Sequence, residues 1–225
     1  MEQYDEYFQY LKTRSRLALL YRRFWLYPRL TLQLRGAVLD VGCGIGDMLK
    51  SRRGMVGVDI NPRLVEYCRE QGLEAHLMKP DELPFENGRF DGVILDNVLE
   101  HIADPEPLLG EIHRVLRVSG RVIVGVPGAF GYTLDPDHKH FYSEVQLHAR
   151  MNGARFTRLR TLYSPFRSSL LDSRLPWYSI YGVYGKQARG RPGDRSSADS
   201  SGRTESVVTP NARQSTNMGR CFSRL

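Results

Sequence analysis

The stretch Asp40-Val41-Gly42-Cys43-Gly44-Ile45-Gly46 decides the fold. It continues the apolar segment 37–41, which predicts a buried strand. Three alternating glycines permit a tight turn into a helix and let the backbone approach a ligand closely. A dinucleotide site would read G-x-G-x-x-G, whereas here the third glycine comes one residue early. Asp40 would repel a pyrophosphate and attract the cationic end of a ligand.

Strand and helix patterns alternate after this turn. Further strands are predicted over residues 55–59, 75–78, 90–95, 121–126, 156–162 and 178–184, and helices over 47–53, 62–71, 105–116 and 143–151. Continuous apolar strands that alternate with helices indicate a mostly parallel sheet with both faces covered. Right-handed crossovers then give an α/β fold, a Rossmann-like doubly wound, mostly parallel seven-stranded sheet.

The chain divides into three segments by composition. Residues 1–36 predict an N-terminal helical cap, because apolar residues follow helical spacing over 4–34, with Pro28 expected to break or kink the helix. Residues 37–187 predict the ligand-binding domain. Residues 188–225 are rich in Ser and Gly, and their arginines outnumber their acids. We therefore expect a disordered basic tail there.

The overall composition excludes several classes of protein. The 225 residues carry a formal net charge of +7, and 41% are hydrophobic, as in ordinary globular chains. No apolar run approaches the ~20 residues of a membrane span, and the acidic first residues are unlike a secretory signal. Cys43, Cys68 and Cys221 fit neither a disulfide framework nor a zinc pattern. We expect a cytoplasmic protein, with peripheral membrane contact through the basic 4–34 helix left open.

Several spaced motifs beyond the glycine turn resemble a known family. They are Gly57-Val58-Asp59-Ile60, Leu83-Pro84-Phe85, Phe90-Asp91, Leu99-Glu100-His101-Ile102, Glu111-Ile112-His113-Arg114-Val115-Leu116 and Ser119-Gly120. With the glycine turn they are similar to class I S-adenosylmethionine-dependent methyltransferases, nearest the type-11, ubiquinone-methyltransferase-like group. The resemblance is strong over residues 37–127 and weaker as far as Gly185. The resemblance therefore implies a methyltransferase with S-adenosylmethionine as its cofactor.

The resemblance also implies a set of cofactor-binding residues, most of them at strand ends. They are Asp40, Gly42, Gly44, Gly46, Asp59, Ile60, Asp81, Asp96 and Asn97. In the family pattern the glycines surround the methionine and ribose parts of the cofactor, and Asp40 lies near its amino group. Asp59 would hold the ribose hydroxyls, Ile60 would pack on adenine, and Asp96 and Asn97 would lie near the methyl group.

The chain departs from the family pattern at the adenine. Lys79 and Pro80 stand where family members usually carry an acid and a backbone N–H. Because proline has no N–H, Asp81 or Glu82 would have to substitute through a shifted loop. This departure leaves open a second interpretation, a non-catalytic cofactor-binding module that scaffolds a partner.

Histidines near strand ends are the candidate catalytic residues, because the pKa of imidazole lies near neutrality. His138 is the predicted base, in the loop that follows the fifth strand, and His101, after the fourth strand, is the second candidate. A packing role for His101 is equally open. Asp135 and Asp137 with nearby histidines could suggest a metal cluster, but such residues are more often turn and capping residues, so no metal is predicted.

The acceptor is constrained by the turn after the fourth strand. Family enzymes that methylate amino groups of nucleic acids carry Asn/Asp-Pro-Pro-aromatic there, whereas this chain has Asp96-Asn97-Val98-Leu99. The resemblance therefore favours a small-molecule, saccharide or lipid-linked acceptor, methylated at oxygen or carbon, and makes nucleic acid an unexpected partner. An NAD-dependent oxidoreductase and an RNA methyltransferase recruited by the arginine tail are alternatives. The sequence gives no oligomeric state.

Overall fold

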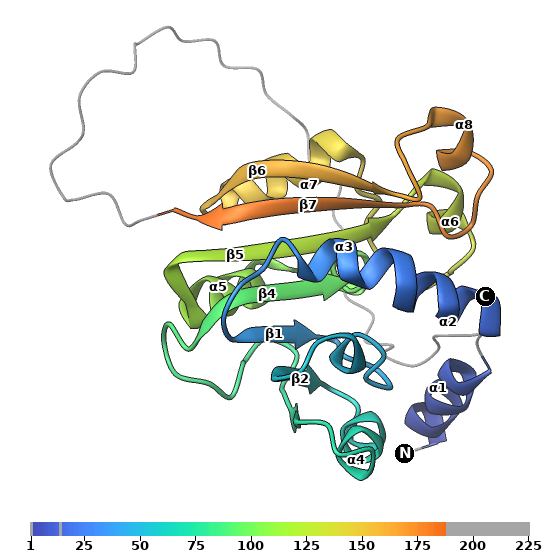
Figure 1. Ribbon diagram of the computed structural model, residues 1–225. Coiled ribbons are helices and arrows are strands. Elements are labelled where there is room, and N and C mark those ends of the chain that lie inside the picture. The colour runs from blue at the N-terminus through green and yellow to red at the C-terminus, as the bar shows by residue number, and fades with distance from the viewer. Residues whose placement is uncertain (1, 14, 188–225) are drawn as a thin grey trace, which may run out of the picture.

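The computed structural model describes residues 2–13 and 15–187. Figure 1 shows one sheet with helices on both sides. The tail predicted over 188–225 lies outside the described residues.

The sheet within the described residues has seven strands in the order β3-β2-β1-β4-β5-β7-β6. They are β1 Val38–Val41, β2 Met55–Asp59, β3 Ala75–Leu77, β4 Phe90–Asp96, β5 Leu116–Pro127, β6 Phe156–Ser164 and β7 Ser179–Lys186. Strands β1 to β5 pair in parallel, and β7 is antiparallel to both β5 and β6. The predicted mostly parallel, doubly wound sheet is confirmed. Because the order reverses at β1, the carboxyl ends of β1 and β4 flank the crevice where such folds bind ligands.

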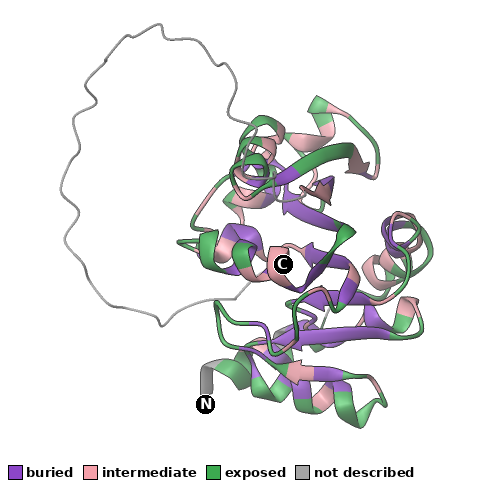
Figure 2. Ribbon diagram, turned by 90° about the vertical axis from the view of Figure 1, so that its left-hand side faces the viewer, coloured by how far each residue is buried: buried purple, intermediate pink, exposed green. Residues whose placement is uncertain are grey.

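Helices cover both faces of this sheet. Those of five or more residues are α1 Glu2–Lys12, α2 Arg16–Tyr21, the π-helical η1 Arg22–Leu26, α3 Tyr27–Thr31, α4 Pro62–Glu70, α5 Glu106–Val115, α6 Ala129–Thr133 and α7 Glu144–Gly153. One core joins α5 and α7 to the sheet, and a second core joins α3 and α4 to the opposite face. In Figure 2 the strands are largely buried and the helices expose their outer sides. Successive residues of β1 point to opposite faces of the sheet, so Leu39 packs in the first core and Val38 in the second.

Some predicted element boundaries were wrong. The strand predicted over 121–126 begins earlier, because Leu116 already has extended backbone angles and β5 starts there. The helix predicted over 47–53 is only the 3-10 turn η2, Leu49–Ser51. Two short helices, α6 and α8 (Ser169–Asp172), were not predicted. Each is shorter than two helical turns, too short to show helical periodicity.

Pro28 neither breaks the N-terminal helix nor ends it. Helices α2, η1 and α3 follow one another without a gap from Arg16 to Thr31. The π-helical turn Arg22–Leu26 comes directly before the proline turn, and such a turn re-registers the backbone hydrogen bonds where the i to i−4 ladder is disturbed. Among the described residues, no helix is long and apolar enough to cross a membrane.

Candidate cofactor and acceptor site

The glycine turn after β1 has the backbone geometry that its sequence requires. Gly42, Gly44 and Gly46 have φ values of 76°, 53° and 77°, in the left-handed region that favours glycine. A Cβ atom at Gly42 would lie 2.6 Å from Cγ2 of Val98, and one at Gly44 would lie 3.4 Å from Cδ1 of Leu11. The turn therefore brings bare backbone to the crevice end of β1.

Replacing Gly42 by alanine is expected to destabilise the fold by about 1–3 kcal/mol and to weaken cofactor binding, because the new methyl group clashes with Val98 in a strained backbone. Gly54→Ala is the matched control: Gly54 has a φ of 77°, but a Cβ atom there would meet nothing within 4 Å. Thermal unfolding and calorimetry with S-adenosylhomocysteine measure both effects. Equal affinity for the ligand in the two variants would contradict the assigned role of Gly42.

Asp59, at the end of β2, holds the glycine turn in place. Its carboxylate accepts hydrogen bonds from the backbone N–H of Gly44 at 3.0 Å and of Asn61 at 2.9 Å. Asn61 in turn caps α4, because its side-chain oxygen accepts a hydrogen bond from Arg63 N–H. The predicted ribose-binding acid therefore touches the predicted cofactor loop directly.

Helix α1 packs beside the same turn. Phe8 and Leu11 form a small buried cluster with Ile45 and Leu64. The amide of Asn61 also donates to the carbonyl of Tyr4 at 3.1 Å. The N-terminal cap therefore closes one side of the glycine turn, a role that no motif in residues 1–36 indicated.

Three carboxylates gather around the crevice end of β1. Asp40 is only 3% exposed. Burial, and then the neighbouring Asp96 and Asp59, raise the pKa of Asp40 well above its ordinary value. A cationic ligand would stabilise the ionised forms of three carboxyl groups held this close together, whereas a pyrophosphate would be repelled by them. S-adenosylmethionine carries a sulfonium and an ammonium group, so this crevice fits the cofactor that the resemblance implied.

The affinity for a cationic cofactor is expected to rise with pH above the ordinary titration range of an aspartate, because burial and neighbouring carboxylates raise the pKa of Asp40 and a bound cation favours its ionised form. Calorimetry in buffers with different ionisation enthalpies should detect proton release on binding. Asp40→Asn removes the titrating group and should flatten this dependence. A wild-type affinity that stays constant with pH would contradict the assignment.

Asp96, at the end of β4, is held by groups from distant parts of the chain. It accepts hydrogen bonds from Tyr181 Oη at 2.8 Å and Asn97 Nδ2 at 3.1 Å, and forms an ion pair with Arg22 at 3.3 Å. Asp96, Gly125 and Tyr181 lie in register across β4, β5 and β7, and a side chain at Gly125 would overlap the Tyr181 ring. Sequence reasoning missed Arg22 and Tyr181 as members of this site.

Asn97 follows Asp96 in a strained conformation, with a φ of 55°. Left-handed backbone at a residue other than glycine is uncommon, and it concentrates at functional sites. The strain lies where the resemblance placed the methyl-transfer end of the cofactor.

The predicted adenine side is open to solvent. Ile60 is 46% exposed, so its side chain is available for a flat ligand. Lys79 Nζ pairs with Glu82 Oε2 at 2.6 Å, and Asp81 between them is exposed. Both acids that could compensate for Pro80, Asp81 and Glu82, are therefore exposed on this side of the crevice.

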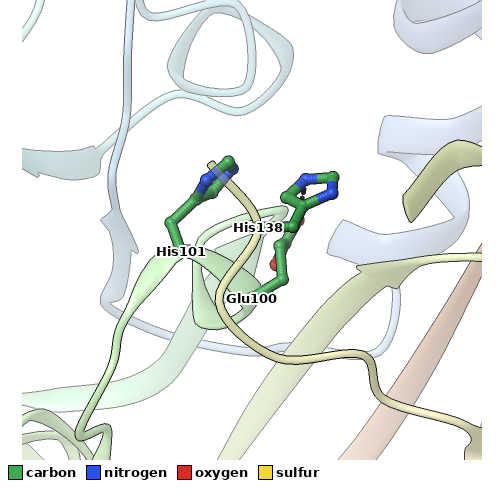
Figure 3. Close-up of side chains that lie close together, drawn as sticks. All are labelled: Glu100, His101 and His138. Carbon is green, nitrogen blue, oxygen red and sulfur yellow. Dashed lines mark ion pairs between the residues drawn. The ribbon is translucent and has the colours of Figure 1, made fainter. Parts of the chain in front are cut away.

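The two predicted catalytic histidines lie together with a buried acid (Figure 3). The ring centroids of His101 and His138 are 4.7 Å apart, and His138 Nε2 lies 4.0 Å from Glu100 Oε1. His138 Nδ1 lies 2.8 Å from the Tyr132 carbonyl oxygen, an arrangement in which Nδ1 donates and Nε2 stays a base. Burial and the nearby His138 lower the pKa of His101 to about 4, which keeps that ring neutral.

Glu100 connects the two parts of this cluster. Its side chain is 1% exposed, and burial, followed by the charge of Asp96, raises its pKa well above the ordinary value. Its backbone carbonyl accepts from the N–H groups of Lys139 at 2.7 Å and His140 at 3.2 Å, which fastens the loop after β5 to the turn after β4. The sequence did not single out Glu100 as a site residue.

The same three side chains have donor atoms that a metal ion could bridge. One ligand atom from each of Glu100, His101 and His138 lies within 4.8 Å of the others. Imidazole and carboxylate together suit divalent transition metals. His140 takes no part: its Nε2 lies 2.8 Å from the Ala103 carbonyl oxygen. The expectation that no metal binds stays a prediction.

Comparisons with known proteins agree with this geometry. Residues 39–124 match the family model described as Methyltransferase domain. The chain is 37% identical over 111 residues to the demethylmenaquinone methyltransferase of Thermus thermophilus, which covers 42% of this chain and 50% of that protein. It is 33% identical over 121 residues to the ubiquinone biosynthesis O-methyltransferase of Xanthomonas oryzae pv. oryzae, covering 46% and 50%. The chain therefore spans about half the length of these curated relatives.

A solved structure shows the same fold. The methyltransferase in the complex with the Haloferax volcanii Trm112 methyltransferase activator has a TM-score of 0.62 at 17% identity, covering 83% of this chain and 98% of that chain. The family match assigns residues 39–124 to a methyltransferase domain, which implies S-adenosylmethionine as its cofactor. The matched segment belongs to the type-11, ubiquinone-methyltransferase-like group, as the motifs predicted.

Proposed function

We propose that this protein transfers the methyl group of S-adenosylmethionine to an oxygen or carbon atom of a small-molecule, saccharide or lipid-linked acceptor. One observation carries the proposal: the cluster of Asp40, Asp59 and Asp96 around a glycine turn of bare backbone. The quinone methyltransferases among its relatives support an acceptor of this class, because their names refer to demethylmenaquinone and to ubiquinone biosynthesis.

Different residues of the chain would bind the cofactor, stabilise its positive charge and accept the proton of the acceptor. The bound cofactor supplies an activated methyl group, so the protein must mainly position the acceptor. The glycine turn and Asp59 hold the cofactor side, while Asp40 and Asp96 provide negative charge near its cationic end. His138 Nε2 accepts the proton of a hydroxyl acceptor, with the ring held through Nδ1.

Label transfer from methyl-labelled S-adenosylmethionine into extracts of the source cells tests this proposal. We expect label in a small-molecule, saccharide or lipid fraction with the wild type, and no such label with the Gly42→Ala variant. Cofactor binding without transfer to any fraction would overturn the proposal and favour the scaffolding module that the Lys79–Pro80 departure leaves open. Label in RNA would overturn the assigned acceptor class.

A further inference from the structure

The outer side of the α2–η1–α3 helix exposes large apolar residues. Leu17 is 78% exposed and Phe24 is 70% exposed, and Leu20 and Trp25 are each at least half exposed. Positions 17, 20 and 24 lie three and four residues apart, so they share one helix face. The opposite face already packs on the sheet through Leu26, Tyr27 and Leu30, so packing on the chain's own core does not account for the outer face.

A second exposed apolar segment adjoins this helix. Phe166, Leu170 and Trp177, on the segment around α8, are each at least half exposed. The rings of Tyr21 and Trp177 make an edge contact at 5.4 Å. Figure 1 shows α2 and α8 at the end of the sheet where β4 and β5 finish. We call this combined surface, from residues 16–25 and 166–177, the docking face.

The helix that forms part of the docking face carries only positive charge. Residues 12–35 contain Lys12 and six arginines and no Asp or Glu. Arg16 and Arg23 are exposed, and the Arg29 guanidinium lies over the Trp25 ring at 5.1 Å. An apolar stripe of leucine, phenylalanine and tryptophan flanked by arginine is typical of a helix that lies in the interface of an anionic membrane.

Other occupants fit this surface less well. RNA would use the arginines and the aromatic rings, but it offers nothing to Leu17 and Leu20. A second copy related by a two-fold axis would bring the acid-free arginine stretch against itself, which is electrostatically unfavourable.

We propose that the docking face binds anionic lipid bilayers and sets the crevice end of the sheet against the membrane surface. This proposal does not depend on methyl transfer.

The chain contains its own fluorescent reporters for the test. Its two tryptophans, Trp25 and Trp177, both belong to the docking face. The full chain is mixed with vesicles of phosphatidylcholine alone, or of phosphatidylcholine with phosphatidylglycerol, and bound protein is measured by co-sedimentation. We expect binding and a blue shift of tryptophan emission only with the anionic vesicles.

Paired variants distinguish vesicle binding by the docking face from vesicle binding by the basic segment 188–225, because all of them keep that segment. Leu20→Ser with Phe24→Ser should weaken vesicle binding at least ~10-fold, and Arg16→Gln with Arg23→Gln ~10- to 30-fold. The matched controls, Val145→Ser on α7 and Arg158→Gln with Arg160→Gln on β6, alter exposed residues elsewhere and should bind like the wild type.

Two results would overturn the inference: no blue shift with anionic vesicles, or wild-type vesicle binding by the Leu20/Phe24 variant. If the oligomeric state of that variant also changes, the face is a contact between copies. Circular dichroism of each variant confirms that its fold is retained.

Discussion

Asp59→Ala is expected to lower the affinity for S-adenosylhomocysteine by more than about 100-fold. The variant loses two hydrogen bonds from backbone N–H groups to a buried carboxylate, those of Gly44 and Asn61, and with them the geometry of the glycine turn. Hydrogen bonds to charged groups contribute roughly 1.5–3 kcal/mol each to stability. Without these two bonds, the ligand must order the glycine turn at the expense of its own binding free energy. Contacts to the ribose hydroxyls would add to it.

Isothermal calorimetry measures this loss, and thermal unfolding shows whether the variant is folded. Glu70→Ala removes an acid that is exposed at the end of α4, so it should leave the affinity unchanged. A folded Asp59→Ala variant that binds within about threefold of the wild type would contradict the role of Asp59.

His138→Ala is expected to lower kcat by about 10²- to 10⁴-fold, the usual contribution of a positioned general base. Cofactor affinity should hardly change, because His138 lies in the loop after β5 and not in the glycine turn. His140→Ala is the matched control: the His140 ring faces the Ala103 carbonyl oxygen, so its loss should have a small effect.

The label-transfer assay with and without a chelator distinguishes two chemical roles for His138. A base predicts that activity survives the chelator. A metal ligand predicts that chelation abolishes activity and that a divalent transition metal restores it. Activity of the His138→Ala variant within about threefold of the wild type would refute both roles.

The sheet and the glycine turn could be predicted because their signals are local. Apolar strands, the three glycines and the Asn61-Pro62 cap each determine backbone geometry within a few residues. The start of β5 could not be predicted from the 121–126 pattern, because pairing of Leu116 with Phe90 draws the chain into the strand earlier. Tertiary pairing overrode the local signal there.

Only those residues of the candidate site that belong to a sequence motif could be predicted. Asp40 and Asp59 stand at strand ends, so the topology brings them together. Arg22 and Tyr181 meet Asp96 across 74 and 85 residues of sequence, contacts that no spacing rule reveals. In the sequence Glu100 is only one residue of a family motif, and its burial beside His138 emerges only when the loop after β5 folds over it.

The most direct test of the central claim is a competition between cofactors at the glycine turn. Calorimetric titrations of the full chain with S-adenosylmethionine, S-adenosylhomocysteine and NAD, each up to about 1 mM, compare cationic and pyrophosphate ligands at one site. We predict that S-adenosylmethionine and S-adenosylhomocysteine both bind and that NAD gives no heat. Asp40→Asn should weaken the binding of S-adenosylmethionine, which carries the sulfonium charge, more than that of S-adenosylhomocysteine. Binding of NAD with no binding of S-adenosylmethionine would contradict the account.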